Sequence, residues 1–360
     1  MITHESCTFR DQPGAVRPED VTLPSHLPDE PGIRQNLARH YNAIARMDTE
    51  LGQHLNDLET DGLAEDTIVF YFSDHGSALP RSKRDLYDDG LRVPLIVRVP
   101  PMWWHLSQHG PRSLVKSPAS LVDLFPSFLA IAGLPIPPQL HDFPLLGKSA
   151  NDRRYVFGGR DRMGERYDLS RTVRSSRYRY VRNYAPHRPL GQYVAFEWLG
   201  AHYQDYETAR VEGRLDAKRE QFWRQKPGEE IQDLDADSDA TANLTESRPH
   251  QVALDEHRLA LDAHLLAIGD TSFIPKHSAL ENWHASQDAA QYPLQAVMDL
   301  AGRAASRDPG NVPNFLMALS HPSPIVRHWA AKGLLILAAA DHPLPEGLEQ
   351  IHEQEDDPQV

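Results

Sequence analysis

The stretch Thr67-Ile-Val-Phe-Tyr-Phe-Ser-Asp-His-Gly76 decides the predicted fold. Its residues 67–72 are β-branched or aromatic without alternation, which predicts a strand buried on both faces, as in a parallel sheet. Ahead of it, apolar residues recur at spacings of three and four across residues 37–58, a pattern typical of an amphipathic helix. A second short strand at 95–97 and a helix across 117–133 are expected to follow. Helix, strand, strand and helix in this order favour an α/β layer architecture.

The sequence pattern changes after residue 150. Two β-rich segments within residues 172–182 surround Ser175-Ser176 and predict a hairpin, and hence a small antiparallel sheet beside the α/β core. Residues 207–225 and 248–268 are expected to be helical. We therefore divide the chain into a portion of the α/β domain (1–150), an antiparallel subdomain with its own helices (151–283) and a truncated helical repeat (294–360).

The last part of the chain predicts paired helices. Residues 311–319 and 324–340 carry the apolar pattern of two helices, and residues 321–335 resemble one unit of a HEAT-type repeat. A single unit cannot bury its own apolar face and normally stacks on neighbouring units. The tail is therefore expected to be truncated and to offer a surface to a protein partner.

The overall charge argues against some classes of partner. The 360 residues include 37 Lys+Arg and 51 Asp+Glu, which gives a formal net charge of -14. Such a surface repels nucleic acid and anionic membranes, so neither is expected as a partner. No apolar run approaches the roughly 20 residues that span a bilayer, and the N-terminus has no visible signal peptide. Cys7 is the only cysteine, which rules out an intrachain disulfide but leaves the compartment open.

The tetrapeptide Ser73-Asp-His-Gly76 is the strongest candidate for a functional site. Ligands of open α/β sheets bind beyond the carboxyl ends of the strands, which is where this tetrapeptide falls. Asp74 offers a hard anionic oxygen and His75 a nitrogen, so together they predict a site for a divalent cation. Gly76 allows the backbone to pass close to a ligand. The alternative is an Asp-His-Gly turn that only caps the next element.

Residues 41–100 resemble the sulfatase family almost continuously. The similar pieces, in chain order, are Tyr41-Asn-Ala-Ile-Ala-Arg-Met-Asp48, Gly62-Leu-Ala-Glu-Asp-Thr-Ile-Val69, Ser73-Asp-His-Gly76, Lys83 and Leu86-Tyr-Asp-Asp-Gly-Leu-Arg-Val-Pro94. The resemblance extends over about residues 1–275. Within the family, Gly159-Arg-Asp-Arg-Met-Gly-Glu-Arg-Tyr-Asp168 and Thr3-His-Glu-Ser6 are similar to the heparan N-sulfatase, or sulfamidase-like, branch.

The resemblance implies part of an alkaline-phosphatase-like core and a set of site residues. By position, Asp74 and His75 would be metal ligands, usually for calcium. Lys83 would contact the sulfate of the substrate, and His4 would lie near that sulfate. The alternative for Lys83 is a solvated surface lysine, and the alternative for His4 is a residue of a disordered terminus. The residues expected to reach the sugar are Arg160, Arg162, Arg166 and His187, with surface salt bridges as the alternative.

The nucleophile of the family is not recognisable in this sequence. Sulfatases use a formylglycine made from Cys or Ser in a Cys/Ser-x-Pro-x-Arg motif, and neither Cys7-Thr-Phe-Arg nor Ser320-His-Pro322 fits that motif. The resemblance therefore implies a segment ahead of Met1 that carries the formylglycine and further metal ligands. The chain alone is expected to be inactive and to bind calcium weakly.

The sequence thus predicts part of a sulfatase that acts on a sulfated carbohydrate or another small sulfate ester. The first alternative is a phosphate or phosphonate ester hydrolase of the same superfamily, which would share the Asp-His pair without needing formylglycine. The second is a non-catalytic binding or scaffold protein that uses the helical tail. The resemblance is compatible with a periplasmic or secreted protein, and the sequence leaves the sugar and the compartment undetermined.

Overall fold

The computed structural model describes residues 14–140, 143–276, 278, 280–281 and 283–343. Its helices are α1 (Pro31–Thr60), α2 (Asp88–Leu91), α3 (Leu124–Ile131), α4 (Ala201–Val211), α5 (Ala217–Glu220), α6 (Gln251–Ile268), α7 (Trp283–Ser286), α8 (Leu294–Ser306), α9 (Val312–Ala318) and α10 (Pro324–Ala338). Its strands are β1 (Val69–Phe72), β2 (Leu95–Arg98), β3 (Val156–Arg160), β4 (Ser170–Arg174), β5 (Tyr178–Asn183) and β6 (Glu229–Asp233).

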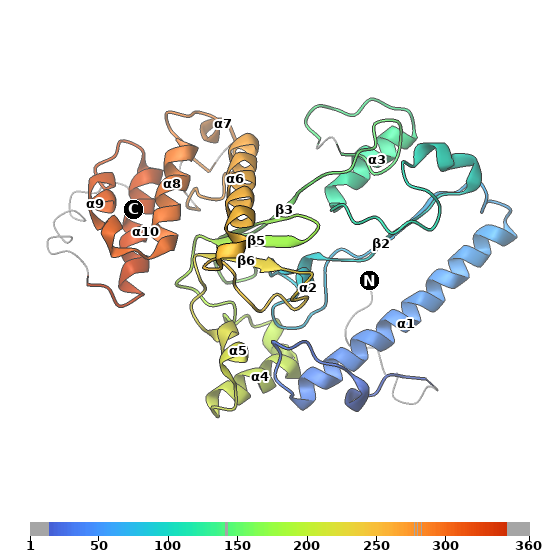
Figure 1. The fold of residues 1–360 in the computed structure, drawn as a ribbon, viewed down its shortest axis with the longest axis horizontal. Coiled ribbons are helices and arrows are strands. Elements are labelled where there is room, and N and C mark those ends of the chain that lie inside the picture. Colours follow the sequence, from blue (N-terminus) through green and yellow to red (C-terminus); the bar gives the residue numbers. More distant parts are fainter. Residues whose placement is uncertain (1–13, 141–142, 277, 279, 282, 344–360) are drawn as a thin grey trace.

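These elements form an elongated molecule that mixes helices and strands, as expected for the α/β class (Figure 1). A four-stranded antiparallel sheet in the order β3-β4-β5-β6 lies at the centre. Helix α1 runs out along one side, and α8, α9 and α10 gather on the opposite side. Within the described ranges, no helix has the length and apolar character needed to cross a bilayer.

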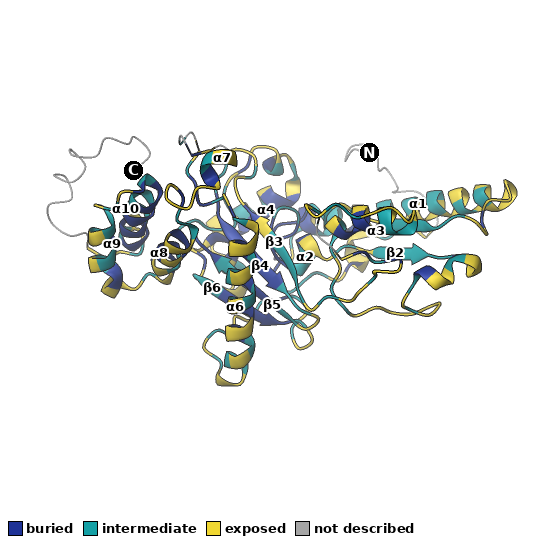
Figure 2. Cartoon of the chain, turned by 90° about the horizontal axis from the view of Figure 1, so that it is seen from above, coloured by how far each residue is buried: buried dark blue, intermediate teal, exposed yellow. Residues whose placement is uncertain are grey.

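Helix α1 contains the predicted helix and is longer at both ends. Pro31 stands at its first turn, where a missing N–H costs nothing. Only its beginning is buried: Ile33 and Leu37 pack with Tyr203 and Tyr206 of α4 in a small apolar cluster. The outer part of α1 is largely exposed (Figure 2). The helix is therefore buried mainly near its beginning, and further along the Tyr71 hydroxyl lies 3.5 Å from Met47 Sδ.

The prediction of a parallel sheet from residues 67–72 and 95–97 is wrong for the described chain. Strand β1 pairs antiparallel with β2, from Val69 opposite Arg98 to Phe72 opposite Leu95, in a two-stranded sheet. Its faces are not fully covered, since Phe72 is 43% and Ile96 61% exposed. A continuous apolar run favours burial of both faces of a strand, but it does not specify whether the partner strand runs parallel or antiparallel.

Two predicted helix boundaries also differ from the structure. The helix expected from residue 117 begins later, with a 3₁₀ turn that starts at Leu121 and leads into α3. The Ser120 N–H caps this turn by donating to the Asp123 carboxylate at 2.8 Å. That local capping competes successfully with the Ser-Pro signal. The helix expected across 207–225 is split, because α4 ends at Val211 and α5 starts only after Asp216 caps it. The helix expected across 248–268 is confirmed by α6.

The central sheet confirms the predicted hairpin and forms the larger core. Strands β4 and β5 pair around Ser175-Ser176, with Thr172 opposite Val181. Apolar residues of the sheet, including Val173 and Ile231, form one buried cluster with Leu261 of α6. Helix α6 contacts β4 and β5. The sheet and α6 therefore form a well-packed unit, called the sheet platform below, against which other parts of the chain pack.

The predicted pair of tail helices is confirmed by α9 and α10, and α8 joins them. Trp329 of α10 is 1% exposed, lies against Tyr184 and Phe273, and donates its indole N–H to the carbonyl of Phe273 at 2.9 Å. The apolar face of the tail is thus buried against the sheet platform. Its likeness to a HEAT unit stays a prediction, and Asp356-Asp357-Pro358 lie outside the described residues.

The loop that follows β1, residues 73–92, is fixed to this platform by buried ion pairs. Asp85 bonds to Arg160 of β3, and each of the two side chains is 8% exposed. Asp88 accepts from Arg174 at 3.0 Å and from Arg179 at 2.5 Å. Pairing in this way offsets the cost of burying these charges, while Arg160 Nε is buried without a hydrogen-bond partner among the described residues. These ion pairs therefore fix the position of the 73–92 loop relative to the central sheet.

The same loop also closes tightly on itself. The Gly76 N–H donates to the carbonyl of Gly90 at 3.0 Å. A Cβ on Gly76 would stand 1.8 Å from the carbonyl oxygen of Asp89, and one on Gly90 would stand 2.1 Å from the carbonyl oxygen of Ser82. Both glycines are required by this close approach of backbone to backbone.

Replacing Gly76 by Ala is expected to destabilise the protein by about 2 kcal/mol or more, because backbone atoms would have to move apart. Urea unfolding followed by circular dichroism measures the loss. The matched control is Gly52→Ala on the exposed part of α1, where nothing lies within 4 Å of an added Cβ. That substitution should be neutral or gain up to about 1 kcal/mol. Equal effects of the two substitutions would contradict the close approach at Gly76.

Replacing Asp85 by Asn is expected to cost about 3 kcal/mol of unfolding free energy, because the buried Arg160 guanidinium loses its charged partner. The control is Glu50→Gln, which breaks the Arg46–Glu50 pair, whose side chains are both 44% exposed. This control should leave the urea midpoint unchanged within error. If Asp85→Asn proved as mild as the control, the pair would not be an anchor of the loop.

Candidate functional site

The candidate metal ligands lie directly after β1, as the sequence predicts. The Ser73 hydroxyl donates to the carbonyl of His75 at 2.9 Å, and His75 Nδ1 lies 2.8 Å from the carbonyl of Gly76. With Nδ1–H donating to that carbonyl, Nε2 carries the free lone pair. Nε2 lies 3.6 Å from Asp74 Oδ2, a separation at which both atoms can reach one cation.

This pair is only part of a metal site. Asp74 is exposed, and across the described ranges no cluster of three or more His, Cys, Asp or Glu side chains is placed to hold a metal ion. Calcium prefers six to eight oxygen ligands, so one carboxylate and one imidazole form an incomplete set for it. The donor types fit a divalent cation, and further ligands would have to join them.

Lys83 lies on the same loop, next to the Asp74–His75 turn. Its N–H donates to the carbonyl of Ser77 at 2.9 Å, and its side chain has no carboxylate partner among the described residues. Arg81, two residues before Lys83, and Arg84, directly after it, adopt left-handed backbone with φ of 68° and 77°. Left-handed conformations of non-glycine residues cost energy and concentrate at functional sites. The loop thus carries one lysine without a carboxylate partner among the described residues, further along the sequence than the two candidate ligands.

The base of the loop carries a second ionisable pair. His26 Nε2 lies 3.6 Å from Asp89 Oδ2. Burial lowers the pKa of His26 to about 3, and burial raises the pKa of Asp89 to about 6. At pH 7 the imidazole is therefore neutral while Asp89 is mostly ionised. Neither group adds positive charge that could assist binding of an anionic substrate at this place.

The three arginines predicted to reach the sugar are all engaged by the protein itself. Arg160 is 7% exposed and pairs with Asp85, with Asp168 Oδ2 at 3.5 Å as a second partner. Arg162 donates to the carbonyl of Gly164 at 3.1 Å, and Arg166 donates to the backbone carbonyl of Tyr193. Arg162 and Arg166 remain accessible enough to turn toward a ligand, whereas Arg160 serves as an anchor.

The two histidines predicted near the substrate are not brought beside Asp74. His4 lies outside the described residues. His187 is half-buried near the tail helix α10, among Arg188, Lys226, Arg307 and Lys332. Burial, followed by the charges of these neighbours, lowers the pKa of His187 to about 4. Its contact with a substrate stays a prediction.

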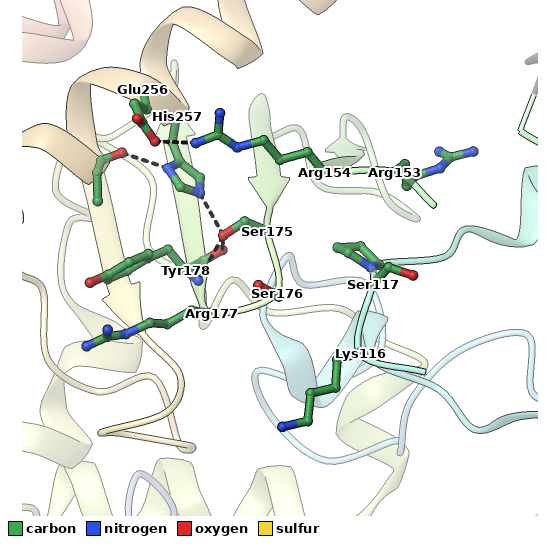
Figure 3. Close-up of a pocket in the computed structure, with 12 residues that line it drawn as sticks. Lys116, Ser117, Arg153, Arg154, Ser175, Ser176, Arg177, Tyr178, Glu256 and His257 are labelled. Atoms are coloured by element: carbon green, nitrogen blue, oxygen red, sulfur yellow. Dashed lines mark hydrogen bonds and ion pairs between the residues drawn. The ribbon is translucent and has the colours of Figure 1, made fainter. Parts of the chain in front are cut away.

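A pocket of about 490 Å³ opens elsewhere, between residues 116–118, the β4–β5 turn and α6 (Figure 3). His257 Nε2 accepts from the Ser175 hydroxyl at 3.0 Å, and Nδ1 lies 2.6 Å from the Ala253 carbonyl. The Arg154 guanidinium reaches the Glu256 carboxylate at 2.6 Å and is neutralised there. None of the predicted site residues lines this pocket.

Sequence reasoning missed the residues that position the loop. These residues are carboxylates and basic groups buried between the loop and the sheet: Asp85, Asp88, Asp168, Arg174, Arg179, Lys226 and Glu230. One signal could have found them. Strands β4 and β5 carry arginines at positions that a packed sheet would otherwise fill with apolar residues, and a buried arginine requires a carboxylate partner.

Comparison with known proteins gives a consistent picture. Residues 4–134 match the family model described as Sulfatase. The chain is 34% identical over 269 residues to the Ulvan-active sulfatase of Formosa agariphila, covering 73% of this chain and 44% of that protein. It is 35% identical over 125 residues to the N-sulphoglucosamine sulphohydrolase of Homo sapiens, covering 35% of this chain and 24% of that protein. A solved 2-O GAG sulfatase superposes with a TM-score of 0.49 and 20% identity, covering 73% of this chain and 49% of that one.

The chain spans less than half the length of the two curated relatives. The matched part includes β1 and the whole 73–92 loop with Asp74, His75 and Lys83. The relatives are named as hydrolases of sulfate groups. The family match and these sequence identities show that residues 4–134 of the chain are part of a sulfatase-family domain.

Proposed function

We propose that this chain supplies part of an active site that hydrolyses sulfate esters or sulfamates of carbohydrates. The observation that carries the proposal is the Asp74–His75 pair, with 3.6 Å between Oδ2 and Nε2 at the end of β1. The pair lies in the part of the chain that matches the sulfatase family model. An unneutralised Lys83 on the same loop adds the positive charge that a sulfate group needs.

In this proposal each residue of the loop has a defined role. Asp74 and His75 hold a divalent cation, calcium in the first instance, whose charge stabilises the sulfuryl group. Lys83 donates to a sulfate oxygen as a compact point charge with three donors. His4, Arg162 and Arg166 are proposed to reach other parts of the substrate. The anchoring ion pairs of Asp85 and Asp88 keep the loop in place for binding.

In this proposal the nucleophile comes from residues that are not in the given sequence. None of the 29 prolines stands in a Cys/Ser-x-Pro-x-Arg motif. A formylglycine hydrate would attack sulfur, and no residue of this chain is a precursor of it. The proposed arrangement therefore has residues 1–150 as a portion of the catalytic domain, with residues 151–283 and 294–360 as the supporting subdomain and tail.

The proposed substrate class follows from the named relatives. One is active on ulvan and another on N-sulphoglucosamine by name. Sulfated carbohydrate is therefore the substrate proposed here, and the choice between sulfate ester and sulfamate is left to experiment. Protein binding through the helical tail is a separate proposal that rests on its resemblance to a repeat unit.

The purified chain is expected to show no turnover of sulfate, sulfamate or phosphate esters, because it lacks the covalent nucleophile. It should bind calcium with millimolar affinity or weaker, and it should bind N-sulfated glucosamine in a calcium-dependent manner. Calorimetry should find this calcium-dependent binding abolished by Asp74→Asn. It should be weakened roughly tenfold by Lys83→Met, which removes a charge-assisted hydrogen bond.

Lys148→Met, on an exposed lysine remote from the loop in sequence, is the matched control and should bind as the unmodified chain does. Turnover of a sulfate ester that is lost on Asp74→Ala would contradict the assignment of the nucleophile to another segment. Turnover of a phosphate ester alone would favour the phosphate or phosphonate hydrolase. Saccharide binding that is independent of calcium and keeps the same affinity in the Lys83→Met variant would favour a non-catalytic binding protein.

A further inference from the structure

A group of basic side chains gathers where the tail helices pack against the central sheet. We call it the Lys332 cluster, and its members are His187, Arg188, Lys226, Arg307 and Lys332. Two hydrogen bonds to backbone carbonyls connect three of the chain segments that carry these residues. The Lys226 N–H donates to the carbonyl of Pro186 at 2.9 Å, and Arg307 Nη2 donates to the carbonyl of Lys226 at 2.6 Å. Lys332 enters from α10.

Two of these cations share one aromatic ring. Lys332 Nζ lies 4.6 Å from the centre of the Tyr167 ring, and the guanidinium carbon of Arg188 lies 5.9 Å from it. Lys332 Nζ also lies 4.2 Å from the Trp329 ring and donates to the Tyr167 hydroxyl at 2.9 Å. An ammonium has three donors, so two on Lys332 remain available. Arg188 and Lys332 thus approach the same space from opposite segments.

The carboxylates of the protein do not neutralise this cluster. Asp168 is close, but Lys226 holds both of its oxygens at 2.5 Å. Across the described residues, Arg188, Arg307 and Lys332 take part in no ion pair. His187 Nδ1, Arg188 Nε and Arg307 Nε are buried and have no hydrogen-bond partner there. A chain with a net charge of -14 has therefore left three basic side chains of this cluster without an ion-pair partner among the described residues.

Such an arrangement costs stability unless something compensates it. Burial, with a further contribution from the charge of Arg188, lowers the pKa of Lys332 to about 7. A buried donor without a partner costs roughly 1–3 kcal/mol. The cost is removed when an anion accepts from these donors and balances the charges. Unsatisfied donors and unbalanced cations at one place therefore point to the same kind of ligand.

We propose that the Lys332 cluster is a binding site for a tetrahedral oxyanion such as sulfate, held by Lys332 and Arg188 beside the Tyr167 ring. These two side chains bring donors from different segments, which suits an ion with oxygens directed to several sides. The site is separate from the Asp74–His75–Lys83 loop and needs no metal. The oxyanion is either free or part of a sulfated saccharide, because both present the same group.

Calorimetric titration of the full chain with sodium sulfate, in EDTA at constant ionic strength and pH 8, tests the proposal. One sulfate should bind, and Lys332→Met should weaken binding roughly tenfold or more. Binding should be accompanied by uptake of up to about one proton, because the anion favours charged Lys332. Tyr167, Asp168, Arg188 and His187 also face Lys332, and His187, with its pKa lowered to about 4 by burial, is neutral at pH 8.

Two matched variants separate this site from the others. Lys83→Met and Lys116→Met, which alter the metal loop and the 490 Å³ pocket, should leave binding in EDTA unchanged. Lys332→Met should also unfold at a higher urea concentration without sulfate, since Met retains the contact with Trp329 and removes a buried amine whose donors are only partly satisfied. N-sulfated glucosamine binding more tightly than inorganic sulfate would identify the sulfamate group of a saccharide as the ligand, and equal affinity would identify the free ion. Both outcomes support the site.

Failure of sulfate to bind in EDTA would overturn the proposal. So would binding that depends on Lys83 or Lys116 rather than on Lys332. A Lys332→Met variant that folds but is less stable than the unmodified chain would mark Lys332 as a structural residue. These outcomes leave the proposed function untouched, because that proposal predicts binding that depends on calcium and on Lys83.

Discussion

The buried ion pairs between the 73–92 loop and the central sheet are the constraint on which the candidate site depends. Asp85 with Arg160, and Asp88 with Arg174 and Arg179, join an N-terminal loop to strands more than 70 residues further along the chain. The loop is strained at Arg81 and Arg84, and its Leu79 packs in the small apolar cluster of α1 and α4. Strained segments persist only where the surrounding structure holds them in place, and here the arginines of the sheet do so.

This dependence continues outward through the molecule. The sheet shares its apolar core with α6 and with the tail, where Trp329 packs on Phe273 and donates to its carbonyl. The tail therefore supports the sheet, the sheet supports the loop, and the loop presents Asp74, His75 and Lys83. Between tail and sheet the same packing assembles the Lys332 cluster. A chain that spans less than half of its curated relatives can still organise these side chains.

Local signals in the sequence were sufficient for much of this structure. The helix across 37–58, the hairpin around Ser175-Ser176 and the tail helices follow from periodicity and turn residues, which act over a few positions. The pairing of β1 with β2 was predicted wrongly, because a continuous apolar run does not specify the direction of a partner. Asp74 and His75 are adjacent in sequence and were easy to find, whereas the anchors Asp85 and Arg160 are 75 positions apart. No pattern within one segment encodes such a pair.

Amide hydrogen exchange in an Arg179→Met variant tests the central claim most directly. Arg179 is 2% exposed and donates to Asp88, and Met removes the charge while keeping much of the side-chain volume. The account predicts faster exchange at the N–H groups of Gly76, Lys83 and Gly90, whose hydrogen bonds close the loop, with unchanged protection in α8 and α10. Unchanged protection of the three loop amides would contradict the account, because the loop would then hold its conformation without the sheet.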